Sequence, residues 1–136
     1  MLHAIRFISG ELDTKLIMRR VDKKNIACKV VGMADAAFAS DRIDRKSQQA
    51  AQTWVFGNPV WWLSRRQSMI ATSSFMAETI ATYELGTELV YERQMLADLG
   101  SPEKGPSLLW QDATASIATA YNDACLLYTS PSPRDA

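Results

Sequence analysis

The chain has little of the chemistry that many enzymes depend on. Among its 136 residues there is one histidine, His3, and there are two cysteines, Cys28 and Cys125. A hydrolase with a serine or cysteine nucleophile would have to use His3 as its base, so we do not expect that class of catalysis. The cysteines lie far apart and lack the short spacing of a zinc site. They fit a reducing compartment, and we therefore expect an intracellular protein.

The sequence also lacks an excess of charge and a long apolar run. Fifteen basic residues balance fifteen acidic ones, so a nucleic-acid partner has to be argued from local groups of residues. No apolar run approaches the roughly 20 residues of a membrane span, and the first residues lack the pattern of a signal peptide. We expect no membrane partner. A hydrophobic content of 47% over this length suits one globular domain with a core.

Hydrophobic spacing and turn residues predict both strands and helices in this chain. The pair Gly57-Asn58 is a favourable two-residue hairpin loop, and Gly100 and Pro102 are typical of a helix end. The expected helices cover residues 2–10, 73–98 and 113–121, and the expected strands cover residues 15–21, 26–35, 52–56, 60–63 and 107–111.

Three acidic residues occupy related places in these elements. Asp35 ends a strand on the face opposite Val30 and Ala34, and Asp112 follows another strand. Glu78 lies early in the long helix, on the same side as its leucines. Each acid also has a simpler interpretation: Asp35 as a turn residue, Glu78 as an acid favoured near a helix start, and Asp112 as a helix N-cap.

Two strand ends and a helix start can converge at one edge of a parallel or mixed sheet. Three carboxylates at such a point repel one another unless cations lie between them. Ligands that are all oxygen favour Mg²⁺ or Mn²⁺ over zinc. Such a site suits phosphodiester hydrolysis with two metal ions.

Four short motifs occur in a fixed order before residue 79. They are Gly32-Met33-Ala34-Asp35, Asp44-Arg45-Lys46-Ser47, Trp62-Leu63-Ser64-Arg65-Arg66-Gln67 and Ser73-Ser74-Phe75-Met76-Ala77-Glu78. In this order they resemble the ribonuclease H region of Copia-type LTR-retrotransposon polyproteins. A later element of that family is similar to Asp112-Ala113-Thr114-Ala115-Ser116. The resemblance covers nearly all of the chain before residue 125.

The resemblance implies an α/β fold of the ribonuclease H type, with a mixed sheet, packed helices and an incomplete C-terminal end. The implied order is three antiparallel strands, a helix, a strand parallel to the first, and a helix. Asp35, Glu78 and Asp112 would be catalytic ligands of two Mg²⁺ ions, with Mn²⁺ as an alternative. The implied reaction is hydrolysis of RNA in an RNA–DNA hybrid. A fourth carboxylate would follow Asp112, so we expect the fragment to be inactive.

The implied partners are the hybrid and the reverse transcriptase domain of the same polyprotein, in the cytoplasm or in the virus-like particle of the parent element. Some substitutions within the family's motifs, such as Ala37 and Ala113, count against full activity. One alternative is a non-catalytic nucleic-acid-binding or structural module of a degenerate polyprotein. Another is a small domain whose acids only form turns and caps. The candidate hybrid contacts are Arg42, Arg45, Lys46, Arg65 and Arg66, and for each a solvated basic residue is an equal alternative.

The end of the chain differs in character from the rest. Residues 125–136 resemble the in-frame translation of a sequencing-library adapter, and the alternative is a disordered tail rich in Ser and Pro. We therefore expect three parts. Residues 1–10 would end the connection from a reverse transcriptase, residues 11–124 would form a partial ribonuclease H-like domain, and residues 125–136 would be a disordered artefact.

Overall fold

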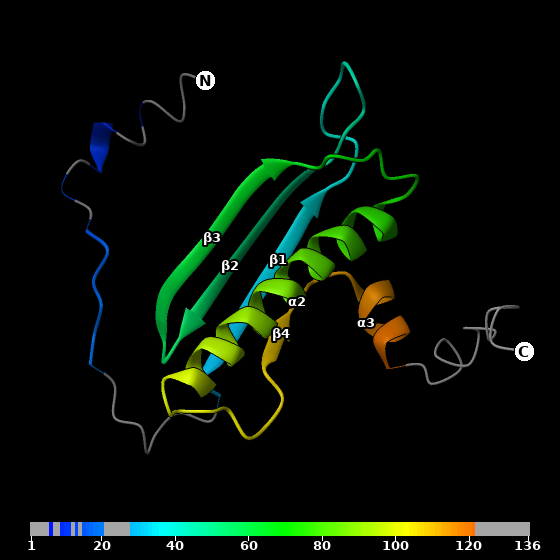
Figure 1. Ribbon diagram of the computed structural model, residues 1–136. Coiled ribbons are helices and arrows are strands. Elements are labelled where there is room, and N and C mark those ends of the chain that lie inside the picture. The colour runs from blue at the N-terminus through cyan, green and yellow to red at the C-terminus, as the bar shows by residue number, and fades with distance from the viewer. Residues whose placement is uncertain (1–5, 7–8, 12, 14, 21–27, 122–136) are drawn as a thin grey trace, which may run out of the picture.

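The computed structural model describes residues 6, 9–11, 13, 15–20 and 28–121. Residues 28–121 contain a four-stranded sheet with a long helix packed along one face (Figure 1). The elements follow in the order β1 (Val30–Ala37), β2 (Gln48–Val55), β3 (Asn58–Arg66), α2 (Ser74–Asp98), β4 (Leu108–Trp110) and α3 (Thr114–Ala120).

The sheet is mixed, and its strands lie in the order β3-β2-β1-β4. Strands β1, β2 and β3 pair antiparallel, whereas β4 pairs parallel to β1. A parallel neighbour needs a crossover connection, and α2 provides it. The expected order of three antiparallel strands, a helix, a parallel strand and a second helix is confirmed.

The hairpin between β2 and β3 turns one residue earlier than expected. Val55 already pairs with Asn58, so the loop is Phe56-Gly57 and not Gly57-Asn58. Both loop residues have positive φ, 50° and 73°, which is the conformation of a tight hairpin turn and favours glycine. The prediction of a two-residue loop is confirmed, but its register is wrong.

Helix α2 has the bounds that its end signals predict. The Ser73 side chain caps its start by accepting a hydrogen bond from the Met76 N–H at 3.1 Å. At its end Gly100 has a φ of 72°, and its N–H donates to the Ala97 carbonyl at 2.9 Å.

The core lies between α2 and the sheet face beneath it. Val30, Ala34, Leu85 and Leu89 are buried there. The helix approaches β1 closely at Gly32, where an added Cβ would lie 2.7 Å from Leu85 Cδ1. The other face of the sheet carries exposed side chains, as the alternation along residues 30–35 predicts.

One expected strand is wrong in the part that the structure describes. Residues 15–20 are exposed and have no regular structure. Their apolar residues find no neighbouring strand in the described part of the chain, and the Arg19 backbone of this segment exchanges hydrogen bonds with the Asn58 side chain. The expected helix over residues 2–10 lies mostly outside the described residues, although Arg6, Ser9 and Gly10 are helical. His3, Cys125 and the tail from residue 122 also lie outside them.

In the described ranges, no helix combines the length and the hydropathy that crossing a membrane requires.

Candidate metal centre

The structure brings together the three acids that the sequence singles out. Asp35 of β1, Glu78 of α2 and Asp112 after β4 each offer a carboxylate oxygen, and these atoms lie within 4.8 Å of one another. The three elements come from distant parts of the sequence, so the cluster depends on the sheet topology. It lies where β1 ends and α2 begins (Figure 1).

The short length of β4 makes room for this cluster. Strand β4 ends at Trp110, which pairs with Met33, so Asp35 and Ala36 extend past the last pair. The Ala36 N–H donates to Glu78 Oε1 at 3.2 Å. The carboxylate of Glu78 thus accepts a hydrogen bond from β1 at the point where β4 no longer pairs with it. At this edge Glu78 can approach Asp35, although the Asp35 side chain lies on the face of the sheet that α2 does not cover.

Glu78 is the buried member of the cluster, with 8% of its surface exposed. Burial raises the pKa of its carboxyl group, and the charges of Asp35 and Asp112 raise it further. Hydrogen bonds from Gln111 and from the Ala36 N–H lower the pKa and oppose these effects. A cation among the three carboxylates would remove the repulsion and favour the ionised form.

The simpler interpretations of the three acids do not agree with the structure. Helix α3 has Ala113 as its N-cap residue and no side-chain cap, so Asp112 does not cap it. The first turn of α2 contains no acid, and Glu78 lies beyond it. Asp35 lies within β1, not in a turn. Local structure therefore does not account for these residues.

The donor set fits a hard divalent cation. It consists of carboxylate oxygens, and Mg²⁺ and Mn²⁺ prefer such ligands. The side chain of Gln111 donates to Glu78 Oε2 at 3.4 Å and holds the carboxylate from outside the cluster. Hydrogen bonds of this kind orient a metal ligand and tune its affinity.

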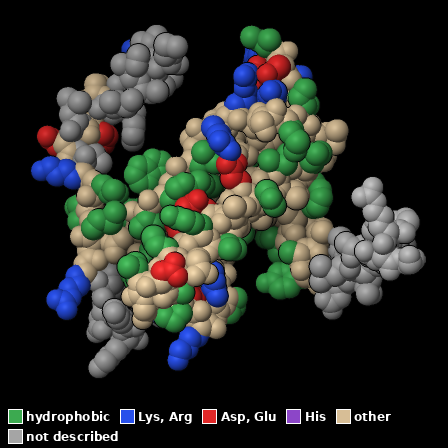
Figure 2. Space-filling view, in the orientation of Figure 1, with side chains coloured by type: hydrophobic (Ala, Val, Ile, Leu, Met, Phe, Trp, Pro, Cys, Tyr) green, Lys and Arg blue, Asp and Glu red, His purple; other side chains and the backbone are tan. Residues whose placement is uncertain are grey.

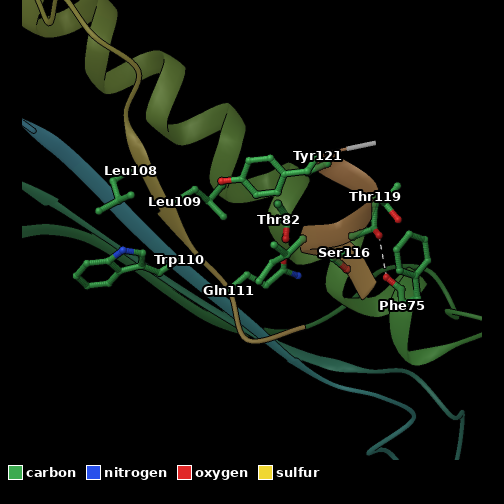
Figure 3. Close-up of a pocket in the computed structure, with 12 residues that line it drawn as sticks. Phe75, Thr82, Leu108, Leu109, Trp110, Gln111, Ser116, Thr119 and Tyr121 are labelled. Atoms are coloured by element: carbon green, nitrogen blue, oxygen red, sulfur yellow. Dashed lines mark hydrogen bonds between the residues drawn. The ribbon is translucent and has the colours of Figure 1, made fainter. Parts of the chain in front are cut away.

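A cavity of about 670 Å³ lies beside this centre, between α2, β4 and α3. Figure 3 shows the ring of Tyr121, the C-cap residue of α3, pointing toward Leu109 of β4. Trp110 extends from the other side of the strand, and 55% of its surface is exposed. Gln111 lines the cavity, but the three clustered acids do not. The cavity is therefore distinct from the acidic cluster.

The structure divides the five basic candidates into two groups. Arg42, Arg45 and Lys46 lie in the loop between β1 and β2, which projects from the sheet at the same end as the acidic cluster (Figure 1). Figure 2 shows basic and acidic side chains gathered on this loop. Arg65 and Arg66 lie at the end of β3, and both form ion pairs.

The ion pairs of the two arginines lie on opposite faces of the sheet. Arg65 pairs with Glu84 of α2, which also accepts a hydrogen bond from buried Gln49. Arg66 pairs with Asp41 at 2.9 Å and with Asp44 at 3.1 Å, both in the projecting loop. The guanidinium group of each arginine is therefore already paired with a carboxylate of this chain.

The two adjacent tryptophans before these arginines differ in exposure. Trp61 is partly buried against the core, whereas 62% of the surface of Trp62 is exposed. Trp61 therefore belongs to the packed side of the sheet, and Trp62 faces solvent.

Sequence reasoning missed one buried acid, Glu92, of which 3% is exposed. The signal was present, because Glu92 lies three residues after Leu89 and four before Leu96 on the buried side of α2. Burial raises the pKa of its carboxyl group, the Thr53 hydroxyl donates to it and lowers the pKa, and the charge of Glu88 raises it.

Comparison with known proteins finds a similarity to a transposon polyprotein. The retrovirus-related Pol polyprotein from transposon TNT 1-94 of Nicotiana tabacum is 34% identical over 91 residues, which are 67% of this chain. The chain is similar to a Pol polyprotein of a transposon. This similarity supports a retroelement polyprotein origin. The chain spans 7% of the length of that relative. No protein-family model matches the chain, and no solved structure matches it.

Proposed function

We propose that the chain is part of a ribonuclease H-like domain of a retrotransposon polyprotein, which hydrolyses the RNA strand of RNA–DNA hybrids. The observation that carries this proposal is the convergence of Asp35, Glu78 and Asp112 from three separate elements. The strand order and the similarity to a transposon Pol polyprotein also support it. In this proposal residues 11–124 belong to the domain, residues 1–10 connect it to a reverse transcriptase, and residues 125–136 are foreign to it.

The proposed reaction adds water across the P–O3′ bond of the RNA strand and leaves a 5′-phosphate and a 3′-hydroxyl. Asp35, Glu78 and Asp112 would hold the divalent cations beside the scissile phosphate. Bound Mg²⁺ or Mn²⁺ would supply activation of the water and stabilisation of the leaving oxygen. Gln111 and the Ala36 N–H keep the Glu78 carboxylate at the edge of the sheet.

The proposed partners are the RNA–DNA hybrid and the reverse transcriptase domain of the same polyprotein. The basic loop that carries Arg42, Arg45 and Lys46 supports a phosphate partner, because it projects beside the acidic cluster. A hybrid is recognised through phosphates on both strands and 2′-hydroxyls on the RNA strand. A module that binds the hybrid without cleaving it remains the alternative, since Ala37 and Ala113 depart from the family's motifs.

The first experiment measures cation binding by the 136-residue chain. Titration with Mn²⁺, followed by electron paramagnetic resonance, compares the unaltered chain with Asp35→Asn. We expect the substitution to weaken Mn²⁺ binding by roughly tenfold or more, because it removes one charged ligand. Asp98→Asn is the matched control, since Asp98 is exposed at the end of α2 and its side chain accepts a hydrogen bond from Gln94. Equal affinity in all three proteins would contradict the proposed centre.

The second experiment measures cleavage of a hybrid with a labelled RNA strand in the presence of Mg²⁺. It uses the reading frame completed from its source, because the resemblance implies a fourth carboxylate. We expect cleavage by the completed protein and none by its Asp35→Asn variant. Tight hybrid binding without cleavage by the completed protein would favour the non-catalytic module.

A further inference from the structure

The backbone of the loop between β1 and β2 is hydrogen-bonded to the two acids of the loop, Asp41 and Asp44. The Ile43 N–H donates to Asp41 Oδ1 at 2.8 Å, and the Lys46 N–H donates to Asp44 Oδ1 at 3.1 Å. The backbone of Asp41 closes the loop, because it accepts from the Arg45 N–H and donates to the Lys46 carbonyl, both at 3.1 Å. Arg45 has a φ of 59°, so this conformation is strained and needs support from outside.

That support comes from β3. Arg66 Nη1 donates to Asp41 Oδ2 at 2.9 Å and also lies 3.1 Å from Asp44 Oδ2. One nitrogen thus joins both acids of the loop through the oxygens that the loop backbone does not use. The Ile43 N–H and the Arg66 side chain both lower the pKa of Asp41, and the Ile43 N–H is the larger cause. Asp41 and Asp44 in turn raise the pKa of Arg66.

The ion pairs also decide which charges the loop presents. Arg66 compensates the two acids, whereas the side chains of Arg42, Arg45 and Lys46 form no ion pair within the part of the chain that the structure describes. Arg42 and Arg45 are exposed, and Lys46 is partly exposed. Three cations are therefore left to meet the phosphates of a nucleic acid.

We propose that Arg66 is a positioning residue that does not contact the nucleic acid itself. By joining Asp41 to Asp44 it fixes the loop so that Arg42, Arg45 and Lys46 face the phosphate backbone of the hybrid. This assignment rests on the proposed function and gives Arg66 a role different from that of a direct phosphate contact.

The first test needs no nucleic acid. Hydrogen exchange of the free 136-residue chain follows the four amides that bond within the loop, those of Asp41, Ile43, Arg45 and Lys46. We expect Arg66→Gln to speed their exchange and Arg66→Lys to restore protection, since an ammonium group can also join two carboxylates. Arg65→Gln is the matched control, because it removes one exposed, paired cation from the adjacent position of β3. Unchanged exchange in Arg66→Gln would overturn the proposal.

The second test measures hybrid affinity by fluorescence anisotropy in EDTA, which prevents cleavage. Arg66→Gln and Arg65→Gln lose the same charge, but we expect the first to weaken binding more, on the order of fivefold. The double variant Asp41→Asn, Asp44→Asn removes both carboxylates that Arg66 joins. It makes the loop more positive, and charge alone would tighten hybrid binding. Because the loop loses its ion pairs, we expect faster exchange of its amides and no tighter binding of the hybrid.

The outcomes separate this proposal from the function on which it rests. Tighter binding by the Asp41→Asn, Asp44→Asn variant, with its loop amides still protected, would identify Arg66 as a direct contact and overturn the positioning role alone. No binding of a hybrid by the unaltered chain would contradict hybrid recognition, and with it the role of the loop. Faster loop exchange and weaker hybrid binding in Arg66→Gln, together with rescue by Arg66→Lys, would support both the positioning role of Arg66 and hybrid recognition by the loop.

Discussion

Two glutamates on the buried side of α2 have similar burial and different surroundings. Of Glu78 8% is exposed, and of Glu92 3%. In both cases burial is the largest cause that raises the pKa of the carboxyl group. Glu78 lies at the edge of the sheet and meets two other carboxylates. Glu92 lies over β2 and meets the hydroxyl of Thr53.

The difference shows why burial of an acid does not by itself indicate a functional site. Both oxygens of Glu78 have a hydrogen-bond donor, the Ala36 N–H and the Gln111 amide. Glu92 Oε2 is buried without a partner among the described residues. A cation would relieve the repulsion at Glu78, whereas at Glu92 the hydrogen bond from the Thr53 hydroxyl opposes the cost of burial only in part. Convergence of acids from several elements, not burial, distinguishes the candidate centre.

The largest expected effect is on cation binding. Glu78→Gln removes the buried ligand of the cluster and should weaken Mn²⁺ binding by roughly a hundredfold, measured by isothermal titration calorimetry. Glu92→Gln removes an equally buried charge from the same helix and should leave the affinity unchanged. If both variants lost affinity equally, the distinction between the two glutamates would be wrong.

The sequence predicted this centre because its three acids sit at the ends of recognisable elements. Helical spacing placed Glu78 on the buried side of α2, and turn and cap residues located the ends of α2 and β4 closely enough. The same spacing puts Glu92 on the buried side of α2, but Glu92 was missed because it belongs to none of the motifs that drew attention to the other acids. The pairing of Arg66 with Asp41 and Asp44 could not be predicted, since it joins residues 25 and 22 positions apart across a sheet whose register the sequence does not specify.

The second expected effect is on folding stability. Glu92→Gln keeps an oxygen that can accept from Thr53 and removes the buried charge, so it should raise the free energy of unfolding at pH 7 by about 1–2 kcal/mol. Urea denaturation in EDTA would measure this. Glu88→Gln serves as the control, because Glu88 is partly exposed and acts on Glu92 only through its charge. A loss of stability in Glu92→Gln would mean that its ionised form is stabilised by contacts not described above.

Tertiary partners, not local patterns, decided the element that the sequence predicted wrongly. Residues 15–20 carry the apolar run Leu16-Ile17-Met18, which favours a strand, yet all six residues are exposed and irregular. A strand requires a neighbour, and this segment has none in the described part of the fold. The apolar run of β1 has neighbours on both sides, β2 and β4, and forms eight residues of strand.

The smallest expected effect is on the pH dependence of folding stability in the two glutamine variants. An acid whose pKa is raised in the folded state contributes its full stability at a pH below its pKa in the unfolded chain, near 4.5. It loses this contribution as the pH rises through its pKa in the folded state. The advantage of Glu92→Gln over the unaltered chain should therefore shrink as the pH falls from 7 toward 4.5, in denaturation curves measured in EDTA. Glu78→Gln should behave in the same way without metal.

With saturating Mn²⁺ the two variants should differ. A bound cation keeps an unaltered Glu78 ionised and adds stability as the pH rises, whereas it does not affect the stability contribution of Glu92. An identical response of both variants to Mn²⁺ would place the cation elsewhere.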